Sequence, residues 1–125
     1  MQILTQQKTE HTPLIKALYI AVDSLDAGGV VDQVTDDVRF QLGNHEALNG
    51  REQVKAANEA FFSTIKAMRH SITGIWSIGD TALCDGSVHY TRKDLSEIEV
   101  PFAAHLDLRG GKISDYRVFV DLSEL

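Results

Sequence analysis

A single cysteine, Cys84, is present in the chain, so no internal disulfide can form and nothing indicates an oxidising compartment. No apolar run reaches the length of a membrane-spanning helix, and the start of the chain lacks the apolar stretch of a signal peptide. Lysine and arginine form no cluster and the net charge is −6, which disfavours contact with nucleic-acid phosphates. We therefore expect a soluble cytoplasmic protein with neither nucleic acid nor membrane as a partner.

Familiar catalytic and cofactor motifs are also missing. The sequence has no glycine-rich dinucleotide loop, no Walker loop, no HExxH zinc motif and no GxSxG nucleophile turn. The histidines do not fall at the spacing of metal ligands. They are His11, His45, His70, His89 and His105. We predict neither a bound metal nor a cofactor.

The helices are predicted in the first half of the chain. Residues 1–11 are polar and are expected to form a frayed arm of a single domain, 1–125. Thr12-Pro13 is typical of a helix start, and Gly28-Gly29 is expected to end that helix. Asn49 is expected to cap a second long helix, with a glutamate three residues later as in a capping box.

The strands are predicted mainly in the second half. One strand is expected from Asp36 to about Leu42, between the two helices. Four long strands are expected near residues 69–78, 82–92, 96–108 and 112–122, separated by turns that contain glycine or Lys93-Asp94. Helices followed by a meander of strands indicate an α+β fold with the helices on one face of an antiparallel sheet.

Several segments together resemble a known superfamily. They are Asp36-Asp37-Val38-Arg39-Phe40, Asn49-Gly50-Arg51-Glu52, Arg69-His70, Trp76-Ser77-Ile78-Gly79-Asp80 and the closing hairpin around Gly110-Gly111. With the element order, they resemble the SnoaL-like branch of the NTF2-like cone proteins, which holds polyketide cyclases, ketosteroid-isomerase relatives and limonene-epoxide-hydrolase relatives. The resemblance implies N-terminal helices packed on a curved antiparallel sheet that encloses a pocket for a small hydrophobic molecule. It also implies a homodimer formed through the outer face of the sheet.

The catalytic sets of two relatives do not carry over. Aligned on the first strand, the aspartate base of ketosteroid isomerases falls at Leu42 and their second acid at Ala104, while only their helix tyrosine has a match, Tyr19. The water-holding tyrosine and asparagine of limonene-epoxide hydrolases fall at Phe40 and Leu42, and their last-strand aspartate falls at Val118. Both mechanisms are therefore disfavoured.

The strand over residues 82–92 has two possible orientations. Alternation alone buries the even positions, which are Ala82, Cys84, Gly86, Val88 and Tyr90. A gap-free match to the relatives instead turns the odd positions, including Asp85, Ser87 and His89, into the pocket. In the second orientation a partner subunit would cover the apolar even face. We favour the second orientation.

The resulting hypothesis is a site built on histidines. His70 and His89 would act as general acid and base, with Asp85 orienting them and Ser87 donating a hydrogen bond. The ligand would be held by aromatic side chains, which are Tyr19, Phe40, Trp76, Phe102 and Tyr116. The structural alternatives are a hydrogen-bonded core histidine at position 70 and a surface pair of Asp85 and His89.

Three functions remain in competition. The first is a cofactor-free enzyme of the cyclase, isomerase or dehydratase type that moves protons on a small hydrophobic, oxygenated substrate. The second is a non-catalytic protein that binds a small molecule in the same pocket. The third is a dimeric scaffold whose pocket is filled by its own aromatic side chains.

Overall fold

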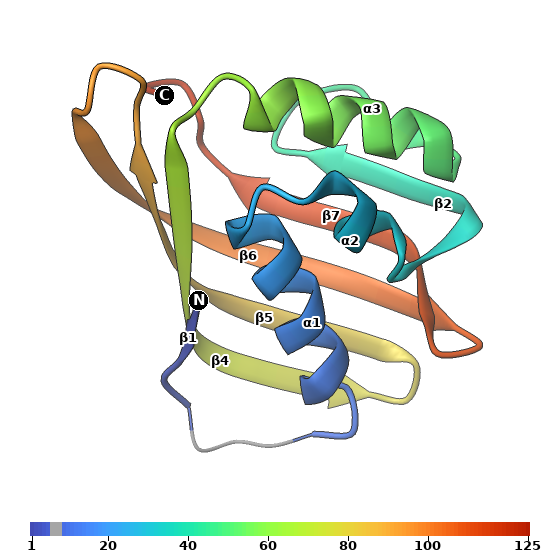
Figure 1. The fold of residues 1–125 in the computed structure, drawn as a ribbon. Helices are drawn as coiled ribbons and strands as arrows, with labels where there is room; N and C mark the ends of the chain where they lie inside the picture. The colour runs from blue at the N-terminus through green and yellow to red at the C-terminus, as the bar shows by residue number, and fades with distance from the viewer. Residues whose placement is uncertain (6–8) are drawn as a thin grey trace.

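The computed structural model describes residues 1–5 and 9–125. In these two ranges, three helices lie on one face of a curved seven-stranded sheet (Figure 1). In chain order the elements are β1 (Gln2–Ile3), α1 (Thr12–Asp23), α2 (Ala27–Val31), β2 (Val34–Leu42), β3 (Leu48–Asn49), α3 (Arg51–Phe62), β4 (Ala67–Ile78), β5 (Thr81–Thr91), β6 (Glu97–Arg109) and β7 (Lys112–Val120). The predicted α+β cone is confirmed.

The sheet is an antiparallel meander with parallel strands added at its sides. The strand order is β1-β4-β5-β6-β7-β2-β3, so the four long C-terminal strands are neighbours in sequence and in space. β2 pairs in parallel with β7, with Phe40 opposite Tyr116. β1 pairs in parallel with β4, and the Leu4 N–H donates to the Ile72 carbonyl at 2.7 Å. Part of the segment expected to be frayed is therefore held by sheet hydrogen bonds.

The helix ends differ from the sequence prediction. α1 ends at Asp23, and Leu25 just after it takes a positive φ of 54°. Gly28 and Gly29, predicted to end α1, instead lie in α2, where the Asp26 side chain accepts from the Gly29 N–H at 3.0 Å. A side-chain cap therefore starts a new short helix at the place where glycines alone suggested a stop.

The predicted capping box at α3 is wrong. Asn49 lies in β3, and Gly50, with a positive φ of 92°, is the residue before the helix. The Asn49 backbone N–H donates to the Gln53 side chain at 3.3 Å. A side chain of the helix therefore caps the strand residue, instead of the Asn49 side chain capping the helix. The backbone turn that joins β3 to α3 requires a conformation that glycine adopts easily.

An irregularity in β4 sets which side chains face the helices. Ile72 pairs with Gly86, but the next pair joins Gly74 to Asp85, so β4 carries one extra residue at Thr73. Gly86 is required here, because a Cβ atom at this position would lie 1.9 Å from the Ser71 carbonyl oxygen. Such a bulge shifts the alternation of side chains along the strand. After the bulge, each side chain therefore faces the side of the sheet opposite to the one that strict alternation from Ile72 would give it.

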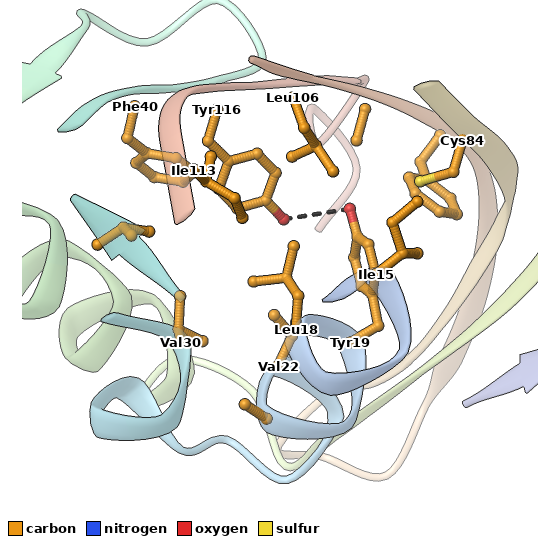
Figure 2. Packing of buried hydrophobic residues seen from close by; sticks show 14 of the residues in the cluster. Ile15, Leu18, Tyr19, Val22, Val30, Phe40, Cys84, Leu106, Ile113 and Tyr116 are labelled. Atoms are coloured by element: carbon orange, nitrogen blue, oxygen red, sulfur yellow. Dashed lines mark hydrogen bonds between the residues drawn. The ribbon is translucent and has the colours of Figure 1, made fainter. Parts of the chain in front are cut away.

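The core lies between the helices and the concave face of the sheet. From α1, Ile15, Leu18 and Tyr19 are almost fully buried, and they pack against side chains of the sheet (Figure 2). On β5 the even positions are the buried ones, including Cys84 and Val88. The alternation of apolar and polar residues therefore predicts the orientation of β5 correctly. The orientation that we favoured, with the odd positions facing the pocket, is wrong.

Candidate functional site

A cavity of about 620 Å³ lies between α3 and the strands that it faces. This volume is in the usual range for sites that hold small molecules. Most of its walls are apolar, with Phe61, Phe62 and Ile65 on the side of α3 and Phe40 and Val118 on the sheet. Side chains from the end of the chain, among them Leu122, close one side.

Polar groups at the cavity are few. His70 and Asn58 border it and are the two buried polar side chains of the part of the chain that the structure describes, at 5% and 9% exposure. His45, Glu46 and Arg92 also border it, and the first two are exposed, which places them at the rim. A bound molecule would therefore meet hydrocarbon almost everywhere and a polar atom at only a few points.

His70 is held by a carboxylate that comes from α1. Its Nδ1 lies 2.6 Å from Asp23 Oδ1, and its backbone N–H donates to Asp23 Oδ2 at 2.9 Å. The amino group of Met1 also lies 3.2 Å from Asp23 Oδ2. Asp23 is the last residue of α1 and His70 is on β4, so the packing of the helix across the sheet creates this pair.

The Asp23 contact fixes how His70 carries its proton. A carboxylate can only accept, so the neutral imidazole holds its proton on Nδ1 and keeps a lone pair on Nε2. Among the residues that the structure describes, none hydrogen-bonds to Nε2, and the ring borders the cavity. The Nε2 lone pair is therefore unused by the described residues, on a ring that borders the cavity.

The charge of Asp23 is kept in a mostly buried place. Burial by itself would raise the pKa of the carboxyl, but the hydrogen bonds from the His70 ring and backbone and the attraction to His70 outweigh it and lower the pKa below its ordinary value. Asp23 is therefore a carboxylate at neutral pH.

Aromatic rings hold the imidazole in position. The ring centroid of Tyr19 lies 4.6 Å from that of His70, and Phe102 meets His70 edge to face at 4.8 Å. The Tyr116 hydroxyl donates to the Tyr19 hydroxyl at 3.1 Å (Figure 2). Burial, with the neighbouring Tyr116 and Cys84, raises the pKa of Tyr19 well above 10, so both hydroxyls stay neutral.

Some of the residues that the sequence hypothesis assigned to the ligand lie at the cavity. Tyr19, Phe40 and Tyr116 border the cavity as expected, and so does His70. Phe102 does not border it and instead packs on the rings of Tyr19 and His70.

The remaining proposed site residues lie on the outer face of the sheet. Asp85, Ser87 and His89 are at odd positions of β5, opposite in direction to its buried even positions, and His89 pairs with the exposed Glu97 at 2.9 Å. Trp76 is 46% exposed, because the bulge at Thr73 turns it away from the side of His70 and Ile72. The expected convergence of these four residues on His70 is wrong.

Sequence reasoning missed two residues of the site. Asp23 ends an amphipathic helix, where a carboxylate normally contacts water, and its partner lies 47 positions further along the chain. Asn58 had a detectable signal, because it lies four residues after Val54 and four before Phe62 and therefore falls on the buried face of α3. A polar residue on an apolar helical face marks a position where packing alone does not explain the choice of residue.

The described residues contain neither a candidate metal cluster nor a candidate membrane span. No group of three His, Cys, Asp or Glu side chains in ranges 1–5 and 9–125 could hold a metal ion. No helix in these ranges is long and apolar enough to cross a membrane.

The fold is shared with solved structures of low sequence identity. A protein of ketosteroid isomerase-like fold from Catenulispora acidiphila, in complex with trimethylamine, has a TM-score of 0.83 at 19% identity over 90% of this chain and 88% of its own. A SnoaL-like polyketide cyclase, so named provisionally, from Jannaschia has a TM-score of 0.80 at 16% identity over 95% and 93%. An LEH-like epoxide hydrolase from M. tuberculosis has a TM-score of 0.76 at 14% identity over 89% of this chain and 82% of its own.

Sequence comparison gives a more specific result. The family model for the SnoaL-like domain matches residues 15–116, which cover most of α1, the elements from α2 to β6, the first part of β7 and the site around His70. No curated protein matches the chain in sequence.

Proposed function

Since this chain belongs to the family of SnoaL-like domains, we propose that it is a cofactor-free acid/base enzyme. Its substrate is a small hydrophobic, oxygenated molecule held in the cavity under α3. The reaction is a proton transfer of the kind used in cyclisation, isomerisation or dehydration. Polyketide cyclase-like proteins are among the structural neighbours, which is consistent with this chemistry.

One observation carries the proposal: His70 borders the cavity while Asp23 holds its Nδ1 at 2.6 Å. Neutral His70 takes a proton from a carbon next to a substrate carbonyl, through the lone pair of Nε2. The imidazolium that forms is stabilised by Asp23 and then returns the proton to another atom of the substrate. Protons and electrons balance without an added reagent, and a histidine can serve in both steps near neutral pH.

The apolar walls support this mechanism. Phe61, Phe62 and Ile65 line the cavity with hydrocarbon, and beside apolar walls the attraction between a new charge and Asp23 is stronger than in bulk water. The rings of Tyr19 and Phe102 keep the imidazole from rotating. The proton acceptor is therefore in place before the substrate binds.

The test is hydrogen exchange in heavy water with 1-tetralone, an uncharged bicyclic ketone. Proton NMR follows loss of the signal of the protons next to the carbonyl. We expect the protein to accelerate exchange, and His70→Gln to lower the acceleration by about a hundredfold or more, since general bases contribute about 10²–10⁴. Asp85→Asn, on the outer face, is the matched control and should exchange like the natural protein.

The alternative function gives a different result in the same experiment. If 1-tetralone binds but exchanges no faster than in buffer, the protein is a binding module and the enzyme proposal is refuted. Acceleration that persists in His70→Gln would refute the assignment of His70 as the base.

We also propose that two copies associate through the outer face of the sheet. The support is an apolar patch of Trp76, Ile78, Leu83 and Phe119, which we call the outer patch. Its members are 40–81% exposed. Trp76 and Leu83 are paired across β4 and β5, and Phe119 lies on β7 two strands beyond β5. Large apolar side chains exposed on one face of a sheet are typical of a protein interface.

A further inference from the structure

Asn58 is a buried amide in the apolar wall of the cavity. It lies in the middle of α3, on the same helical face as Val54 and Phe62, and it is 9% exposed. It borders the cavity together with the neighbouring Phe61 and Ala57. Neither the family match nor the role of His70 accounts for an amide at this position.

The side chain of Asn58 has a determined orientation. Its Nδ2 donates to the Val54 carbonyl at 2.8 Å, one turn earlier in the helix. Since a carbonyl only accepts, the nitrogen must face it and the side-chain oxygen must point elsewhere. The Oδ1 atom has no hydrogen-bond partner among the residues that the structure describes.

The free oxygen is open to the cavity. In the described ranges, the side-chain nitrogen and oxygen atoms that are both inaccessible to solvent and without a hydrogen-bond partner are Arg51 Nε, Ser77 Oγ and Arg117 Nε. Asn58 Oδ1 has no partner and is not among these atoms, so it is accessible. An atom that is accessible on a residue so deeply buried is reached through the space that the residue borders, which is the cavity.

This placement costs stability in the empty protein. Asparagine is a weaker helix former than leucine, and its side chain contributes less apolar area to the buried face of the helix. A leucine would continue the apolar face between Val54 and Phe62. An amide at this position is therefore less favourable for folding than a leucine, and what it adds to the cavity wall is a hydrogen-bond acceptor.

We propose that Asn58 determines specificity by accepting a hydrogen bond from a hydroxyl group of the ligand. The ligand class is then a hydrophobic molecule with a hydroxyl placed against α3, in addition to the carbonyl that reacts at His70. An acceptor-only oxygen in an apolar wall discriminates between a hydroxyl and its methyl ether. This inference rests on the proposed function only in requiring that the cavity binds a molecule.

The experiment compares 2-naphthol with 2-methoxynaphthalene, which lacks the hydroxyl donor, by titration calorimetry. We expect the natural protein to bind 2-naphthol about three- to tenfold more tightly, the range of one net hydrogen bond. Asn58→Leu should bind the two molecules equally and should melt no lower than the natural protein without ligand. Asn49→Leu, the same change at an exposed position, should keep the preference, and Asn58→Ala serves if the leucine variant does not fold.

The outcomes separate this inference from the proposed function. If the natural protein binds both molecules equally, or if the preference survives in Asn58→Leu and Asn58→Ala, the role of Asn58 is refuted while the cavity proposal stands. A preference that disappears only in His70→Gln assigns the hydroxyl to His70 and also refutes the role of Asn58. If neither molecule binds to the natural protein, the ligand cavity itself is refuted.

Discussion

Removal of the Asp23 carboxylate should destabilise the protein and disable His70. In Asp23→Ala, the His70 ring N–H and backbone N–H both lose their acceptor. Hydrogen bonds to charged groups contribute about 1.5–3 kcal/mol each, so the loss is about 3–6 kcal/mol in the free energy of unfolding. Domains of this size are stable by about 5–15 kcal/mol, so the variant should lose a large share of its stability.

Asp23→Asn separates stability from chemistry. One amide oxygen can serve one of the two donors, so the expected loss is about 1.5–3 kcal/mol and the variant should fold. If the amide nitrogen turns to His70, it donates to Nδ1 and moves the ring proton to Nε2. Nε2 then has no lone pair to accept a proton from the substrate. The rate of hydrogen exchange of 1-tetralone should fall about as far as in His70→Gln.

Urea unfolding at several pH values measures the stability effect. The pKa of Asp23 is lowered in the folded protein from its ordinary value of 3.8, despite burial, by its hydrogen bonds with His70. Its contribution is therefore complete above about pH 4 and is lost as the pH falls through the lower, folded pKa. The gap in unfolding free energy between the natural protein and Asp23→Asn should narrow in that acidic range. Equal urea midpoints at neutral pH would refute the reasoning.

Three further predictions concern the sheet and its core. Gly86→Ala should cost at least about 1–3 kcal/mol in urea unfolding, since its Cβ would collide with the Ser71 carbonyl oxygen, and an unchanged midpoint would contradict the bulge. Phe119→Glu in the outer patch should convert a dimer into a monomer in analytical ultracentrifugation, whereas a monomeric natural protein would exclude the dimer. Burial raises the pKa of all three tyrosines, so phenolate absorbance should not appear near pH 10 until the protein unfolds, and stability should fall as the pH rises above that value.

The long strands could be predicted from the sequence because their signals are local. Alternating apolar residues and glycine turns placed the last four strands within two residues of their observed ends. The end of α1 could not be placed in this way, because Asp26 caps a second helix over the two glycines that suggested a stop. Competing local signals of similar strength are resolved only by packing.

The site was less predictable, because it depends on which way side chains face. The single extra residue at Thr73 places Trp76 outside while Ile72 stays inside, and nothing in the spacing of apolar residues reveals it. On β5, simple alternation gave the correct face and the alignment to distant relatives gave the wrong one. The Asp23 to His70 contact joins a helix end to a strand, so no local pattern contains it.

The parallel pairing of β2 with β7 has a consequence for synthesis on the ribosome. The helices and β2 emerge first, but Phe40 finds its sheet neighbour Tyr116 only after almost the whole chain has been made. Contacts between such distant segments fold slowly, since the intervening loop must close first. The apolar faces of the nascent first half therefore stay exposed during translation, and this half is the part of the chain that chaperones are expected to protect.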